Sequence, residues 1–104
     1  MTGNGLAIDI CICTFRRAYL VQTLRSIAQL RLPPEFSVRV IVADNDDWPS
    51  ARDMVMQAIA ETGLSITYLH APARNISVAR NACLDEATAP FLAFIDDDEL
   101  VTEN

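Results

Sequence analysis

Apolar and polar residues follow one another along the chain in blocks that are typical of strands and helices. Four short segments, 8–13, 36–43, 64–69 and 91–95, are rich in apolar residues, and the first is apolar at nearly every position. Runs of this length and composition predict strands that are covered on both faces, as in parallel sheets.

Segments with helical spacing separate these predicted strands. The second of them is expected to begin at Ser50, with Asp53 three residues later as a weak capping box, and to stop at Gly63. The third is expected over 77–87. The first is expected over 17–30, with a buried side formed by Leu20, Leu24, Ile27 and Ala28.

The resulting order, in which every helix connects two strands, predicts one α/β domain. Such connections are right-handed crossovers between parallel strands, and they place helices on both faces of the sheet. We therefore expect a three-layer sandwich with a mainly parallel sheet. The length of 104 residues agrees with a single domain.

Three consecutive carboxylates, Asp96, Asp97 and Asp98, directly follow the last predicted strand. Like charges placed together repel, and a hard divalent cation such as Mg²⁺ or Mn²⁺ relieves that repulsion through oxygen ligands. A solvated acidic loop without a ligand is the alternative interpretation of this triplet alone.

Polar residues also follow the other three predicted strands, in segments 14–17, 44–47 and 70–80. In open α/β sheets ligands bind in the crevice outside the carboxyl ends of the strands. Carboxylates there can hold a metal, and arginines bind phosphate through paired hydrogen bonds. This set of side chains indicates a nucleoside diphosphate together with its metal.

Composition narrows the classes of function. The formal net charge of −6 argues against a nucleic-acid partner, because phosphates must be neutralised by basic side chains. All eight basic residues are arginines, which removes the lysine of a Walker-type loop or a Schiff base and counts against a phospho-receiver site. No apolar run reaches the roughly 20 residues that span a bilayer, and segment 1–5 lacks the features of a signal peptide.

The three cysteines are expected to be buried and reduced. Cys11 and Cys13 are two residues apart on a predicted strand, so they share one face and cannot bridge each other there. Metal ligation by these two with Cys83 is the alternative. Buried thiols are favoured because cysteine is among the most buried residue types, and reduced cysteines are typical of a cytosolic protein.

Four stretches resemble, in order, the motifs of the family 2 glycosyltransferases, which have the type-A nucleotide-sugar-binding fold. Segment 10–17 resembles a strand that usually ends Pro-Thr-Tyr-Asn-Arg, and 40–46 resembles one that ends Asp-Asp-Gly-Ser. Segment 74–81 resembles Gly-Ile-Ser-Ala-Ala-Arg-Asn, and 94–100 contains the Asp-x-Asp motif. The likeness is greatest to bacterial exopolysaccharide glycosyltransferases of the succinoglycan-biosynthesis kind.

The resemblance implies a strand order of 3-2-1-4 and a role for five residues. Asp44 would accept a hydrogen bond from uracil, Thr14 would line the base pocket and Arg80 would face the nucleotide. Asp96 would hold the ribose or the metal shell, and Asp98 would bind Mn²⁺ or Mg²⁺ directly. These residues are expected to converge on one crevice.

Three positions depart from the family's motifs. Cys13 replaces a proline and Arg16 an asparagine, which affects contacts to the base. Asn75 stands where glycine is common, and asparagine tolerates a left-handed backbone better than most residues. Outside these motifs, His70 is expected to be a plain strand-end residue, and Trp48 to pack on its own helix rather than on a base.

Residues 1–104 are therefore expected to be the donor-binding domain of a longer enzyme. The resemblance implies metal-dependent, inverting transfer from a UDP-sugar to a saccharide acceptor that is lipid-linked, with the general base beyond this segment. It also implies a cytoplasmic protein, with the full-length enzyme at the inner face of the membrane. A magnesium-binding receiver-like module and a nucleotidyltransferase are the alternatives.

Overall fold

The computed structural model describes residues 6–73 and 75–98. Within these residues four strands alternate with three helices, as expected. The elements are β1 (Leu6–Thr14), α1 (Leu20–Ala28), β2 (Phe36–Asp44), α2 (Arg52–Thr62), β3 (Ile66–His70), α3 (Ile76–Glu86) and β4 (Phe91–Asp96).

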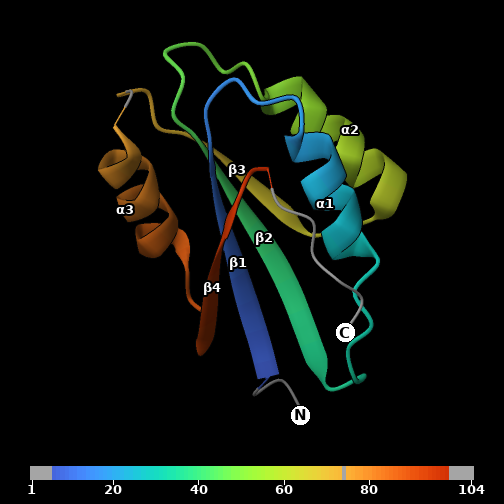
Figure 1. Cartoon of the computed structure of the whole chain (residues 1–104). Coiled ribbons are helices and arrows are strands. Elements are labelled where there is room, and N and C mark those ends of the chain that lie inside the picture. The colour runs from blue at the N-terminus through green and yellow to red at the C-terminus, as the bar shows by residue number, and fades with distance from the viewer. Residues whose placement is uncertain (1–5, 74, 99–104) are drawn as a thin grey trace.

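The four strands form one parallel sheet in the order β3-β2-β1-β4. This confirms the predicted fold class and strand order. The register pairs Thr14 with Asp44 and Cys13 with Asp96, so the carboxyl ends of β1, β2 and β4 meet at one edge of the sheet. All the segments predicted to carry chemistry follow strands that end at this edge (Figure 1).

The helices cover the two faces of the sheet unequally. Helices α1 and α2 lie on one face and α3 lies on the other (Figure 1). Alternation along β1 explains how one strand serves both layers, because Ile10 and Ile12 join the core under α1 and α2 while Cys11 joins the core under α3. No helix within 6–73 and 75–98 has the length and hydropathy that a membrane crossing requires.

The starts of all three helices differ from the prediction, and α1 begins at Leu20 rather than at residue 17. Ser50 does not cap α2, because its hydroxyl donates to Asp46 at 2.8 Å and the cap position is Ala51. Asn75 is extended, with φ −137°, and its side chain accepts from the backbone N–H of Ser77, so it is an N-cap and not a left-handed residue. The stop at Gly63 is confirmed, with φ 73°.

A buried ion pair holds the other end of the sheet. Asp9 is 3% exposed and accepts hydrogen bonds from the guanidinium of Arg39 at 3.1 and 3.2 Å. The backbone N–H groups of Thr88 and Ala89 donate to the same carboxylate, which fixes the entry into β4. Arg39 also pairs with Glu86 at the end of α3. These bonds, chiefly the one from Arg39, lower the pKa of Asp9 to about 2.

We expect Asp9→Asn to lower the free energy of unfolding by about 2 kcal/mol at pH 7, because charged hydrogen bonds are lost in a buried place. Since the folded pKa of about 2 lies below the ordinary value of 3.8, the stability from Asp9 is present above pH 4 and is lost as the pH falls toward 2. Urea denaturation from pH 7 to pH 2 measures this difference. The exposed Asp85 supplies the control variant Asp85→Asn, and a pH-independent gap between Asp9→Asn and the wild type would contradict the assignment.

Candidate functional site

An open cavity of about 340 Å³ lies at the carboxyl edge of the sheet, within the range of roughly 300 to 1,000 Å³ that is usual for ligand pockets. Its wall comes from the ends of β1, β2 and β4 and from the start of α3. The lining residues are Cys13, Thr14, Phe15, Arg17, Asn45, Ile76, Asp96, Asp97 and Asp98.

A second, smaller cavity of about 40 Å³ adjoins the first and brings in Arg80. Cys13, Ile76 and Asp96 line both cavities, so the two share a wall between β1, β4 and α3. Of the residues predicted to form the site, Thr14 and Asp98 line the larger cavity and Arg80 lines the smaller one. The structure therefore brings four of the five predicted residues to one region.

Asp44 is the predicted site residue that does not line either cavity. Its carboxylate is fully buried and accepts hydrogen bonds from the backbone of Asp46 and Ala51 and from the hydroxyl of Tyr68 at 2.7 Å. Burial and this bond raise the pKa of Tyr68. Asp44 thus organises the loop after β2, and its neighbour Asn45 lines the cavity instead.

Asn45 is held firmly in that position. Its backbone N–H donates to the carbonyl of Thr14 at 2.8 Å, which continues the pairing with β1 one residue past the end of β2. Its side-chain amide donates to the carbonyl of Ala71 at 2.9 Å. Sequence reasoning assigned the base contact to Asp44, and the alternation along the strand end could have pointed to Asn45.

The three aspartates after β4 do not behave alike. Asp97 points inward, where its carboxylate accepts from the hydroxyl of Thr14 at 2.9 Å and its carbonyl accepts from the hydroxyl of Thr23 at 3.2 Å. Asp96 and Asp98 are exposed and line the cavity. The middle residue is therefore an anchor, and the outer two present carboxylates to the cavity.

Arg17 supplies the positive charge beside this triplet. Its guanidinium pairs with Asp97 at 3.1 Å and lies 3.7 Å from Asp98, while about half of its side chain is exposed. Sequence reasoning gave Arg17 no role. Because it lines the cavity, it can also reach a bound anion, and a guanidinium is well suited to phosphate oxygens.

The exposed carboxylates fit a hard divalent cation. Asp96 and Asp98 offer oxygen ligands, and Mg²⁺ commonly binds one or two carboxylates and fills its remaining positions with water and substrate phosphates. A group of three or more histidine, cysteine or acidic side chains that could hold a metal alone is not found among the described residues. The donor set therefore suits a cation that arrives with a phosphorylated ligand.

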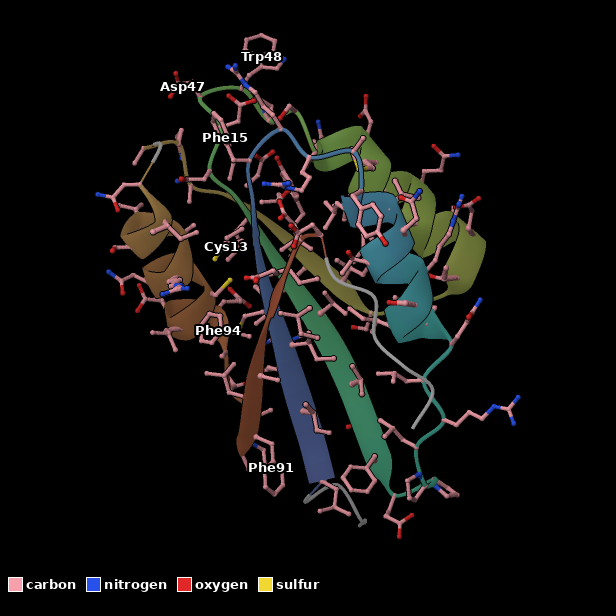
Figure 2. All side chains as sticks on the ribbon, in the orientation of Figure 1. Cys13, Phe15, Asp47, Trp48, Phe91 and Phe94 are labelled. Atoms are coloured by element: carbon pink, nitrogen blue, oxygen red, sulfur yellow. The ribbon has the colours of Figure 1, made fainter. Side chains whose placement is uncertain are left out.

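Two aromatic side chains, Phe15 and Trp48, lie on the loops after β1 and β2 (Figure 2). Phe15 lines the cavity, and the guanidinium of Arg16 lies over its ring at 5.1 Å. Arg16 has φ 53° and is fixed by Asp46 at 2.9 Å, and this bond lowers the pKa of Asp46. Trp48 is 74% exposed, so the prediction that it packs on its own helix is wrong.

The three cysteines lie close together on the side of the sheet that faces α3. All are free thiols; Cys11 and Cys83 are fully buried, as predicted, and Cys13 is only partly buried. Hydrogen bonding with Cys13, together with burial, raises the pKa of Cys83. His70, expected to be a plain strand-end residue, contacts the carbonyl of Asp46 at 2.8 Å.

Comparison with known sequences matches the chain to one family and one curated relative. The description "Glycosyl transferase family 2" applies to residues 9–104. The chain is 52% identical over 102 residues to the succinoglycan biosynthesis protein ExoM of Rhizobium meliloti (strain 1021). That alignment covers 98% of the chain and 33% of ExoM, so the chain spans about a third of the length of this relative.

Solved structures share the fold. The mannosyltransferase PcManGT from Pyrobaculum calidifontis, solved with GDP-Man and Mn²⁺, matches with a TM-score of 0.78 at 22% identity, over 89% of this chain and 28% of that one. Residues 1–349 of TarS from S. aureus match with a TM-score of 0.75 at 21% identity, over 92% of this chain and 28% of that one. At these identities the likeness establishes the fold alone.

We expect Asp97→Asn to lower the melting temperature of the metal-free chain by about 10 °C, since it loses about 2 kcal/mol of charged hydrogen bonding to Thr14 and Arg17. Asp98→Asn is the matched control, because Asp98 is half exposed and its ion pair contributes about 1 kcal/mol at most. Circular dichroism melting measures both variants. Equal melting temperatures would show that Asp97 is not the anchor.

Proposed function

This chain belongs to glycosyl transferase family 2, and from that premise we propose that its cavity binds a nucleoside-diphosphate sugar together with Mg²⁺ or Mn²⁺. The observation that carries the proposal is the pair of exposed carboxylates, Asp96 and Asp98, that line a cavity also lined by Arg17. The chain is thus a glycosyltransferase domain related to a succinoglycan biosynthesis protein.

Each residue at the cavity has a distinct task in this proposal. Asp98 and Asp96 hold the cation, which when bound neutralises the diphosphate leaving group as a Lewis acid. Arg17, which pairs with Asp97 and lies 3.7 Å from Asp98, would donate hydrogen bonds to the diphosphate oxygens. Arg80 approaches the nucleotide from the adjoining cavity.

We assign the base to the side of the cavity formed by Thr14, Phe15 and Asn45. Phe15 offers an aromatic surface, and Thr14 is held in place by its bond to Asp97. We propose uracil as the base, supported by the structures of TarS in complex with UDP and with UDP-GlcNAc. A contact from Asp44 to uracil stays a prediction, because it requires the exchange of one of the hydrogen bonds that this carboxylate accepts.

The activity of the longer protein is a wider proposal. We propose that it transfers the sugar with inversion to a growing, lipid-linked saccharide at the inner face of the membrane. Such transfer needs a general base that deprotonates the acceptor hydroxyl. Asp97 cannot supply it, because its carboxylate is occupied by Thr14 and Arg17.

We expect UDP with Mn²⁺ to raise the melting temperature of the chain by at least about 10 °C at a hundredfold excess over the Kd, since that excess stabilises by about 2.7 kcal/mol. Asp96→Asn and Asp98→Asn remove the rise, and Asp85→Asn on α3 leaves it unchanged. A rise with Mn²⁺ alone would favour a receiver-like metal site. Calorimetry with UDP, GDP and ATP identifies the base, and tighter binding of ATP would refute the uridine assignment.

We also expect residues 1–104 to bind the donor without transferring its sugar. The reason is that, within residues 6–73 and 75–98, every carboxylate that lines the cavity is engaged either by the proposed metal or by the anchoring bonds. Incubation with radiolabelled UDP-glucose and an oligosaccharide acceptor measures transfer. Product formed by this chain at a rate abolished by Asp98→Asn would show that the base lies within these residues.

A further inference from the structure

Cys13 occupies an unusual place for a thiol. It lies on β1, is partly buried, and lines both cavities at the carboxyl edge of the sheet. In the register of the sheet it is the partner of Asp96 on β4. A small solute that enters the cavity therefore meets the Cys13 thiol directly beside the proposed cation ligands.

A second thiol lies behind the first. Cys83 projects from α3 into the core between this helix and the sheet, where it is fully buried, and Cys13 packs against that core. Cys13 and Cys83 therefore border the same core, one from the sheet and the other from α3. Figure 2 shows Cys13 on the side of β1 that faces α3, with sulfur atoms in the space between the two elements.

Cys11 completes the cluster but differs in access. It belongs to the same core and is fully buried, and neither cavity is lined by it. An oxidant from solvent can thus reach Cys13 first, through the cavity. Cys11 shares a strand face with Cys13 and cannot bridge it there, so Cys83 on α3 is the thiol of this core that can form the bond.

We propose that Cys13 and Cys83 form an oxidisable pair, with Cys13 as the thiol that reacts with a peroxide and Cys83 as the thiol that resolves the product. The Cys13 thiolate attacks one peroxide oxygen, the O–O bond breaks, and a sulfenic acid and hydroxide form. The Cys83 sulfur then attacks the sulfenic sulfur, the S–O bond breaks, and water leaves as the disulfide forms. Two thiols are oxidised and one hydrogen peroxide is reduced to two waters.

This bond would alter the cavity that the proposed function uses, so the functional consequence depends on that proposal. Ile76 and Arg80 on α3 line the same cavities as Cys13. A disulfide has narrow limits for its length and dihedral angle, so forming it would restrain Cys13 against α3. We therefore expect the oxidised chain to bind donor and cation more weakly, and reduction to restore binding.

The chemistry is tested by mass spectrometry of the chain after treatment with hydrogen peroxide and alkylation of the remaining thiols. The expected product retains one free thiol of the original three and contains a cross-link between the peptides 1–16 and 81–104 that trypsin releases. The peptide 1–16 contains both Cys11 and Cys13, so the variant Cys11→Ser is needed to show which of the two is cross-linked to Cys83. The cross-link persists in Cys11→Ser and disappears in Cys13→Ser, each shown to be folded by circular dichroism.

Two results would overturn the pairing: a Cys13→Ser chain that still forms the cross-link, or a wild-type chain whose three thiols stay free. The functional arm is calorimetry with UDP and Mn²⁺, in which oxidation raises the Kd at least about tenfold and a reductant reverses the change. Unchanged affinity in the cross-linked chain would refute the effect on binding. A reduced chain that binds neither UDP nor Mn²⁺ would instead refute the proposed function and leave the disulfide result intact.

Discussion

The geometry of the cavity depends on the inward turn of Asp97. Its carboxylate and carbonyl accept from Thr14 at the end of β1 and from Thr23 on α1, so one residue ties the end of β4 to two other elements. Because the middle aspartate is fixed, its neighbours Asp96 and Asp98 are held beside the cavity, although their charges repel. The fold tolerates three consecutive negative charges because Asp97 accepts a hydrogen bond from Thr14, and the charge of Arg17 partly offsets that of Asp97.

The fold could be predicted from the sequence because local pattern and global packing agree. Apolar strands, intervening helices and the Gly63 stop all indicated the same parallel sheet, and the structure has the expected strand order. The starts of α2 and α3 were harder to predict from the sequence. As a cap, the oxygen of Ser50 would accept from a backbone N–H at the start of the helix, but in the structure its hydroxyl donates to Asp46. The local sequence pattern does not reveal which of these two bonds forms.

The site was predicted in part, and the limit is physical. Strand ends locate Thr14, Arg80, Asp96 and Asp98 at one edge, since parallel strands deliver their carboxyl ends together. Which carboxylate turns inward is decided by tertiary hydrogen bonds. Asp44 is satisfied by three donors that come from three separate places in the sequence, so its withdrawal from the cavity could not be read from its motif. Arg17 was overlooked for the same reason, because its partners lie far along the chain.

The Asp9 ion pair, which contributes to the free energy of folding, lies far along β1 from the residues that line the cavity. Asp9 and Thr14 are five residues apart on one extended strand, a span of about 16 Å at roughly 3.3 Å per residue, and they share no bonded partner. Substitutions that far apart usually combine additively. Substitutions at the cavity end of β1, which we propose to bind the donor, can therefore be combined with stabilising substitutions at the other end, and the two changes in folding free energy are expected to add.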